Sequence, residues 1–221
     1  MRLVLLGLPG VGKGTQASLI ARESNTPHYS TGDIFREILK SSSLLSRKVA
    51  KYVNEGELVP DDIVFEMVKK FIADNEVNAN GWVLDGFPRN KRQAEMLDDL
   101  LGEESHRLNF AIHLTVNRDI LVNRLYGRRV CSNCGAIYNL SMNPTQKEGI
   151  CDKCGGMLER RKDDSKETIL KRISIFESEF LPLRKYYQDQ GILIEVNGES
   201  RVQDVFNQIK ERLEIGQERR N

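Results

Sequence analysis

Short apolar runs alternate with longer segments of helical periodicity along this chain. Each run is bounded by turn-forming residues, which is the pattern of a buried strand. The predicted strands are Leu3–Leu6, His28–Ser30, Gly81–Asp85, Asn109–Thr115 and Ile192–Val196. The predicted helices are Lys13–Glu23, Ile34–Lys40, Leu44–Glu55, Asp61–Asp74, Asn117–Arg128, a long segment that ends near Gln190 and a segment that begins at Arg201. Alternation at this spacing predicts an α/β fold with a five-stranded parallel sheet flanked by helices.

The turn after the first apolar run has the spacing of a phosphate-binding loop. Gly7, Gly12 and Lys13 fit the pattern G-x-x-x-x-G-K between a strand and a helix. Glycines allow several N–H groups to point into one concavity, and the following helix adds a partial positive charge. Lys13 is then placed to reach the β- and γ-phosphates of a nucleoside triphosphate. The alternative is a glycine-rich turn without a ligand, but strand, spacing, lysine and helix all favour the phosphate loop.

The residue after this lysine departs from the general pattern. Gly14 stands where Ser or Thr usually binds Mg²⁺, and the hydroxyl comes one residue later, on Thr15. This shift indicates a subclass of phosphate-loop proteins. A secretory signal is another interpretation of the apolar N-terminal stretch, but glycines and Pro9 interrupt it and no cleavage site is evident.

The third predicted strand ends in a carboxylate. Asp85, at the carboxyl end of a strand beside a phosphate loop, is placed to hold Mg²⁺, commonly through water. The alternative is that Asp85 caps the turn before the next helix. Arg89 carries a guanidinium fork that suits a phosphate, and Gln93 carries an amide donor and acceptor that suit a base edge.

A second group of polar residues follows the second predicted strand. Thr31 lies at a helix start, where its hydroxyl either caps the helix or binds a ligand. Arg36 follows on the same helix, and taken alone it would be a solvated surface residue. Farther on, Gly56–Pro60 separates two helices, because Gly ends one helix and Pro cannot continue it.

Four cysteines form two close pairs. Cys131-x-x-Cys134 and Cys151-x-x-Cys154 have the spacing of a four-thiolate zinc site. Four protein ligands leave no open position for substrate, so we expect a structural metal that holds together a segment too short to form its own core. A nucleic-acid-binding zinc ribbon is the alternative. The cysteine segment lies inside a phosphate-loop fold, and this position favours a nucleotide over a nucleic acid as the ligand.

Arginines flank the cysteine segment on both sides. Arg124 and Arg128 precede it, and Arg161 and Arg172 follow it. Any one of them alone is an ordinary surface charge, but four of them can converge on a transferring phosphoryl group and neutralise its oxygens. Asp163–Asp164 either pairs with these arginines or caps the next helix.

Composition narrows the class of partner. The chain has 33 Lys and Arg against 32 Asp and Glu, so its net charge gives no footprint for nucleic acid or an anionic membrane. No apolar run approaches the roughly 18 residues of a membrane span. We therefore expect a soluble, cytoplasmic protein with small-molecule partners, no nucleic acid and no membrane.

Taken together, the motifs resemble those of the adenylate kinase family, in its bacterial form with a long zinc-binding lid. The resemblance covers nearly the whole chain. It rests on Gly7–Thr15, Ser30–Asp33 with Arg36, Gly56–Pro60, Asp85–Arg89 with Gln93, Gly127–Arg129, and Arg161–Asp164 with Arg172. The late hydroxyl of Thr15 fits, because this family typically reads Gly-Lys-Gly-Thr. Two departures from the family pattern, Phe35 and Asn90, touch no expected phosphate ligand.

The resemblance implies the P-loop nucleoside monophosphate kinase fold in three parts. The core would be residues 1–29, 60–126 and 161–221, the helical insert that binds the monophosphate would be 30–59, and the zinc-ribbon-like lid would be 127–160. The implied ATP site is Gly10, Val11, Gly12, Lys13, Gly14, Thr15, Arg124, Arg128, Ile137, Tyr138 and Ser200. The implied AMP site is Thr31, Arg36, Glu57, Leu58, Val59, Gly86, Phe87, Pro88, Arg89, Gln93, Arg161 and Arg172. The residues expected to act in catalysis are Lys13, Asp85, Arg89, Arg128, Arg161 and Arg172.

The implied activity is reversible, Mg²⁺-dependent transfer of a phosphoryl group from ATP to AMP, which gives two ADP. No residue has the setting of a covalent nucleophile, so direct transfer is expected, with lid closure excluding water. The partners would be ATP, AMP and ADP, and the chain is expected to act as a monomer. The alternatives are a kinase for UMP, CMP or GMP, a zinc-ribbon nucleic-acid-binding module, and an inactive nucleotide sensor.

Overall fold

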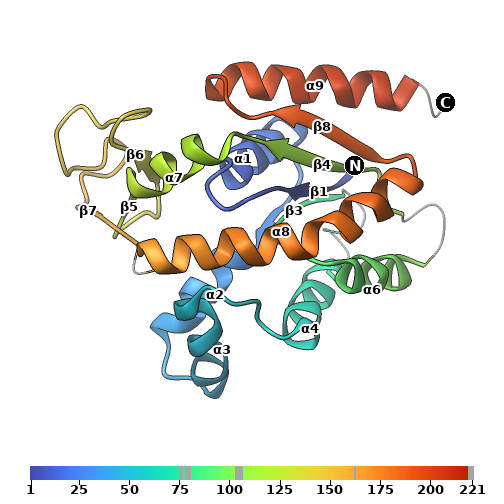
Figure 1. Ribbon diagram of the computed structural model, residues 1–221, viewed down its shortest axis with the longest axis horizontal. Helices are drawn as coiled ribbons and strands as arrows, with labels where there is room; N and C mark the ends of the chain where they lie inside the picture. Colours follow the sequence, from blue (N-terminus) through green and yellow to red (C-terminus); the bar gives the residue numbers. More distant parts are fainter. Residues whose placement is uncertain (75–76, 78–80, 103–106, 162, 219–221) are drawn as a thin grey trace.

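The computed structural model describes residues 1–221 except 75–76, 78–80, 103–106, 162 and 219–221 (Figure 1). Its elements, in chain order, are β1 (Arg2–Leu6), α1 (Lys13–Ser24), β2 (His28–Ser30), α2 (Thr31–Lys40), α3 (Leu44–Glu55), α4 (Asp61–Ile72), β3 (Trp82–Asp85), α6 (Lys91–Leu101), β4 (Phe110–Thr115), α7 (Arg118–Tyr126), β5 (Arg128–Cys131), β6 (Ile137–Asn139), β7 (Leu158–Glu159), α8 (Lys166–Asp189), β8 (Leu193–Asn197) and α9 (Val202–Glu218). The five predicted strands are therefore confirmed to within about two residues at their ends.

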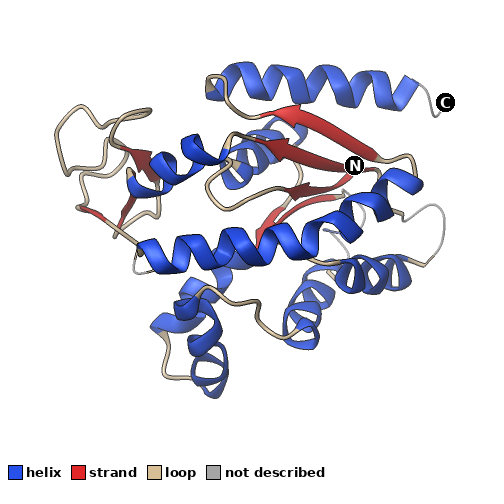
Figure 2. Ribbon diagram, viewed as in Figure 1, coloured by secondary structure: helices blue, strands red, loops and turns tan. Residues whose placement is uncertain are grey.

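The main sheet has five parallel strands in the order β2-β3-β1-β4-β8. Strand β1 lies at its centre, where Leu3 pairs with Val83 on one side and with Phe110 on the other. Helices cover both faces of this sheet (Figure 2). The chain places β2 and β3 on one side of β1 and then crosses over to place β4 and β8 on the other side. The carboxyl end of β1 is therefore a topological switch point, where α/β folds bind ligands.

The two faces of β1 enter two different hydrophobic cores. Leu3 and Leu5 pack into the core that contains residues of α1 and α9, whereas Val4 and Leu6 pack into the core that contains residues of α4, α6 and α8. All four side chains are at most 2% exposed. A strand buried on both faces reads as a continuous apolar run, which is why this strand was visible in the sequence.

Two segments extend from the core toward the same end of the sheet. Helices α2 and α3 pack on each other. Between α7 and α8 the chain forms a second, antiparallel sheet in the order β6-β5-β7, within the segment 127–160 that is predicted to be a lid and keeps that name below. In Figure 1 this small sheet lies at the left, on the side toward which the arrows of β4 and β8 point, and α2 and α3 lie at the bottom. No helix within the described ranges is both long and apolar enough to cross a membrane.

Helix starts decide two of the alternatives left open by the sequence. The N-cap of α2 is Ser30, whose side chain accepts a hydrogen bond from the N–H of Asp33, so Thr31 is not the cap. The N-cap of α6 is Asn90, so the capping alternative for Asp85 is wrong. Ser30 and Asn90 both carry the short oxygen-bearing side chains that satisfy the first N–H groups of a helix.

Candidate functional site

The loop after β1 has the backbone of an anion-binding nest. Gly10 and Gly12 have φ values of 82° and 107°, which other residues rarely adopt. At Gly10 a Cβ would also lie 2.7 Å from Cγ of Leu125, so a side chain has no room there. Helix α1 begins after Gly12 without a side-chain cap and without an acidic residue in its first turn. Its first N–H groups therefore remain available for an anion.

Lys13 lies inside this loop and close to other cations. Its Nζ donates to the carbonyl oxygens of Gly7 at 2.7 Å and Leu8 at 3.0 Å. Burial lowers the pKa of Lys13 to about 8, Asp85 opposes this shift, and guanidinium groups of the site add to it. These groups belong to Arg89, Arg128 and Arg172. Lys13 and these three of the predicted arginines therefore lie in one region.

Asp85 lies at the junction of three strands. It is in register with Leu5 of β1 and Ser30 of β2. Asp85 is the last residue of β3, so it lies at the carboxyl end of the sheet. A Cβ on Gly14 would lie 3.1 Å from Oδ2 of Asp85. This close approach gives a physical reason why glycine, and not Ser or Thr, follows the lysine in this loop. The carboxylate packs directly against the start of α1.

Thr31, which follows β2, packs against Gly86, which follows β3. The hydroxyl of Thr31 donates to the carbonyl of Asp85 at 3.3 Å, and the residue is 1% exposed. A Cβ at Gly86 would lie 2.6 Å from Oγ1 of Thr31. Beyond Gly86, Phe87 and Pro88 are buried and joined by a cis peptide bond. Among the predicted acceptor residues, these four therefore form one packed wall.

The two acidic residues after the lid bind two of the predicted arginines. Arg128 Nε donates to Oδ2 of Asp164 at 2.7 Å, and its NH2 donates to Oδ1. Arg172 donates to Oδ2 of Asp163 at 2.6 Å. Helix α8 is capped by Ser165, which accepts from the N–H of Thr168. The open choice between pairing and capping is thereby decided for pairing.

Three further arginines complete the cationic region, with different partners. Arg36 pairs with Asp33 on the same helix. Arg89 Nε donates to the carbonyl of Gly86 at 2.9 Å. Although its side chain opens on solvent, desolvation by the surrounding protein lowers the pKa of Arg89 to about 10, and the charge of Arg172 adds to this shift. Burial lowers the pKa of Arg161 to about 10, and the positive charges of Arg128 and Arg36 add to this shift. Within the described chain, Nε of Arg161 is buried without a hydrogen-bond partner.

The remaining predicted acceptor residues form the edge toward α8 and α4. Glu57 accepts from Nζ of Lys171 at 2.8 Å, which fastens its side chain to α8. Leu58 is partly buried and Val59 is 6% exposed. Gln93 is 1% exposed, and protein groups already bind both ends of its amide: Oε1 accepts from the N–H of Arg89, and Nε2 donates to Asp61.

The predicted donor-side residues are held by backbone and lid contacts. Arg124 donates to the carbonyls of Gly198 at 2.9 Å and Glu199 at 3.2 Å, so its guanidinium is committed to the loop that contains the exposed Ser200. Ile137 is 43% exposed on β6. Tyr138 is 8% exposed and turns its hydroxyl into the lid, toward the cysteines. Ile137, unlike Tyr138, presents its side chain to solvent.

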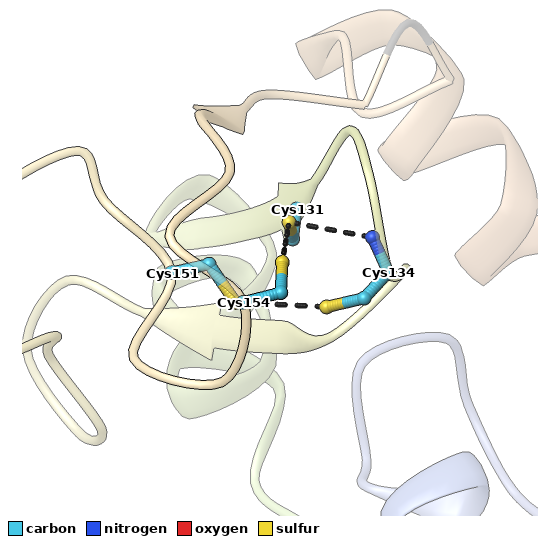
Figure 3. Close-up of side chains that lie close together, drawn as sticks. All are labelled: Cys131, Cys134, Cys151 and Cys154. Atoms are coloured by element: carbon cyan, nitrogen blue, oxygen red, sulfur yellow. Dashed lines mark hydrogen bonds between the residues drawn. The ribbon is translucent and has the colours of Figure 1, made fainter.

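The four cysteines form one cluster inside the lid (Figure 3). Their Sγ atoms all lie within 4.8 Å of one another, with Cys131 and Cys154 at 3.5 Å and Cys134 and Cys151 at 3.6 Å. A zinc–sulfur bond of about 2.3 Å in a tetrahedron requires sulfur atoms about 3.8 Å apart, whereas a disulfide requires about 2.05 Å. The cluster therefore fits a metal and not a disulfide pair.

One residue that organises this site, Asp61, carries no functional signal in the sequence. Asp61 accepts hydrogen bonds from the amides of Gln93 at 2.7 Å and Asn90 at 3.2 Å. Acidic residues are common in the first turn of a helix, so an aspartate directly after Pro60 carries no signal of its own. Only its contact with a segment about 30 residues away along the chain identifies it.

Comparisons with known proteins agree with the resemblance. The family model described as adenylate kinase matches residues 5–192. A protein of Carboxydothermus hydrogenoformans named adenylate kinase is 45% identical over 214 residues, which cover 97% of this chain and 100% of that protein. Proteins of the same name from Geobacillus sp. (strain WCH70) and Bacillus subtilis (strain 168) are each 43% identical over 213 residues, which cover 96% of this chain and 98% of each protein.

Proposed function

Because the chain belongs to the adenylate kinase family, its reaction is reversible phosphoryl transfer between ATP and AMP, and we propose that the site described above performs it by direct in-line transfer. The observation that carries this proposal is the convergence of Lys13 and the arginines on the switch point of the sheet. The transferring group carries negative charge on its equatorial oxygens. A cage of fixed cations stabilises that charge without reorganising during the reaction.

The donor side is the loop and the lid. ATP is proposed to place its phosphates on Gly10–Thr15, where the N–H groups of α1 are uncapped. Arg128 contributes from the lid hinge, with Ile137 and Tyr138 above it. The adenine is proposed to lie near Arg124 and the backbone at Ser200, which Arg124 holds in place.

The acceptor side is the wall at the ends of β2 and β3. The AMP phosphate is proposed to meet Arg36, Arg89, Arg161 and Arg172. The unpartnered Nε of Arg161 supports this, because a buried guanidinium nitrogen normally finds an acceptor. The nucleoside would then lie against Thr31, Glu57–Val59, Gly86–Pro88 and Gln93.

The residues act by positioning and by charge. Lys13 and the arginines hold the donor and acceptor oxygens in line, and Asp163 and Asp164 hold two of those arginines in a fixed geometry. A closed lid excludes the water that would otherwise accept the phosphoryl group. No side chain is required to form a covalent intermediate.

Asp85 and Thr15 are the residues that suit Mg²⁺ in this site. The carboxylate of Asp85 lies against the start of α1, and the hydroxyl of Thr15 is exposed there. Carboxylate, hydroxyl, water and phosphate oxygens are the ligands that Mg²⁺ prefers. Held by these residues, Mg²⁺ would supply positive charge against the phosphate oxygens. Asp85 is proposed to hold it, directly or through water.

The lid cysteines are proposed to hold a structural zinc ion, with all four positions taken by Cys131, Cys134, Cys151 and Cys154. Beside the cluster, the lid core described here has few buried residues, chiefly Tyr138. A metal then supplies stability that so small a core cannot.

Replacing Cys131 with alanine is expected to abolish stoichiometric zinc binding. It is also expected to lower the stability of the folded chain by about 3 kcal/mol, which shifts the melting temperature by about 6–12 °C. Zinc content by elemental analysis and thermal unfolding by calorimetry measure both effects. Lys153→Ala, an exposed change within the second cysteine pair, is the matched control. Full metal content with an unchanged transition in the Cys131 variant would rule the zinc site out.

The identity of the acceptor nucleotide distinguishes the proposed function from its nearest alternatives. A kinase for UMP, CMP or GMP shares the phosphate machinery, so ADP formation from ATP is to be measured with AMP, GMP, CMP and UMP side by side. AMP is expected to be the preferred acceptor. A faster rate with another monophosphate would reassign the acceptor, and no ADP with any of them would contradict the transferase function itself.

The partners proposed for this chain are ATP, AMP and ADP, and we propose that it works as a cytoplasmic monomer without nucleic acid or membrane. Support for a monomer comes from the site, because one chain supplies the loop, both groups of arginines and the lid. The near balance of acidic and basic residues gives no support to a nucleic-acid module.

A further inference from the structure

Asp61 connects two segments of the proposed acceptor site. It is the first residue of α4, directly after Glu57–Pro60, and its side chain is 15% exposed. Oδ1 accepts from Nε2 of Gln93 at 2.7 Å and from Nδ2 of Asn90 at 3.2 Å. Both partners lie at the start of α6, next to Arg89. One carboxylate therefore ties the end of the helical insert to the segment that carries the phosphate-binding arginine.

These contacts also fix the orientation of the Gln93 amide. A carboxylate only accepts hydrogen bonds, so the end that faces Asp61 must be the NH₂ group. At the other end Oε1 accepts from the backbone N–H of Arg89 at 2.7 Å. Gln93 is 1% exposed, so these protein partners set its orientation and solvent does not. Each end keeps one further bonding position, a donor at Nε2 and an acceptor at Oε1.

This fixed order of donor and acceptor suits one kind of purine. Adenine offers an amino donor beside a ring-nitrogen acceptor, which is the complement of an amide edge. Hypoxanthine, the base of IMP, has a carbonyl in place of the amino group and a protonated ring nitrogen, so its order is reversed. An amide that cannot turn over distinguishes the two.

We propose that Asp61 is a positioning residue that determines acceptor affinity and purine specificity by holding Gln93 and, through it, Arg89. The proposal rests on the proposed function, because it assumes that the site at Gln93 receives the acceptor. The partners of Asp61 are protein groups, so it would act on the acceptor through Gln93. Its neighbour Asp62 has a side chain that is 81% exposed and pairs with Arg92 on the surface. The chain thus offers a matched control one residue away.

The test compares Asp61→Ala, Asp61→Asn and Asp62→Ala with the unaltered chain, each assayed below its own melting temperature. With saturating ATP, Asp61→Ala is expected to raise the KM for AMP about tenfold and to reduce the preference for AMP over IMP about tenfold, the effect of losing one well-oriented base contact. The KM for ATP is expected to stay within about twofold, because the donor loop is untouched. Asp61→Asn keeps one acceptor for Gln93 and is expected to restore most of the loss. Asp62→Ala is expected to match the unaltered chain.

A double variant separates positioning from general damage. If Asp61 acts through Gln93, then Asp61→Ala combined with Gln93→Ala is expected to be no worse for AMP than Gln93→Ala alone. Multiplying effects, an unchanged AMP to IMP ratio in Asp61→Ala, or an equal rise in both KM values would overturn the proposal. Failure of the unaltered chain to use AMP would instead contradict the proposed function, so the two failures are distinguishable.

Discussion

Replacing Lys13 with methionine is expected to lower kcat by about 1,000-fold or more, the range seen when a cation is removed from a phosphoryl-transfer site. Methionine keeps the length and the apolar stem of lysine but removes the charge that would meet the β- and γ-phosphates. Initial rates of ADP formation at saturating ATP and AMP measure this effect. Lys185→Met is the matched control, because the side chain of that lysine is 76% exposed and its one ion pair among the described residues is with Asp189 in the next turn.

The same variant tests the electrostatic state of the free enzyme. The pKa of Lys13 is lowered in the folded chain to about 8 from 10.5, so folding disfavours its charged form. This penalty is complete below pH 8 and disappears as the pH rises past the unfolded pKa of about 10.5. Relative to Lys13→Met, the unaltered chain is therefore expected to gain about 1–3 kcal/mol of unfolding free energy between pH 7 and pH 10.5.

Urea unfolding of both variants without nucleotide, at several pH values, measures this difference. Titration of the other lysines is common to both variants and cancels. A difference that does not vary with pH would show that Lys13 is fully hydrated in the folded chain. Near-normal turnover of Lys13→Met would show that the loop does not hold the donor phosphates.

The cations of the site thus oppose one another until a phosphate arrives. Desolvation by the surrounding protein, together with neighbouring arginines, lowers the pKa values of Lys13, Arg89 and Arg161. Fixed like charges cost stability in the free protein, but they need no rearrangement when negative charge develops between two nucleotides. At these residues the positive charges that favour phosphoryl transfer therefore lower the stability of the free protein.

The phosphate loop was predictable because its signal is local. The apolar run Leu3–Leu6, the glycines with positive φ and the uncapped helix after Gly12 all lie within about twenty residues. The cysteine cluster was predictable for the same reason, since two pairs with fixed internal spacing limit the geometry. The parallel sheet followed from alternation of strands and helices.

The hydrogen-bond partners of individual side chains could not be predicted from the sequence. Nothing near Gln93 in the sequence indicates that its amide binds Asp61, and nothing near Tyr138 indicates that its hydroxyl faces Cys151. The pairing of Asp164 with Arg128 joins residues on opposite sides of the lid. Such contacts depend on the packing of distant segments, so only the folded chain decides between the roles that a residue type allows.

Replacing Asp164 with asparagine is expected to lower the free energy of unfolding by about 3 kcal/mol or more, because it leaves buried arginine charge without a partner. Asp164 is fully buried, and the side chain of Arg128 is 14% exposed. Arg128 would also lose the fork that fixes its guanidinium, and a misplacement of about 1 Å lowers a transfer rate by about 100-fold. Urea unfolding and kcat measure the two effects. Asp189→Asn, at an exposed pair, is expected to change stability by less than about 0.5 kcal/mol.

A second variant shows whether this buried pair serves stability or catalysis. Removing both charges, as in Asp164→Asn with Arg128→Gln, eliminates the unpaired cation and is expected to recover much of the lost stability, since buried pairs contribute little net stability compared with neutral partners. The same double variant is expected to recover no activity, because the arginine that would meet the donor phosphates is absent. Recovery of both would mean that Arg128 only supports the fold of the lid hinge. Recovery of stability alone would show that the pair is kept for the geometry that it gives to the transferring phosphoryl group.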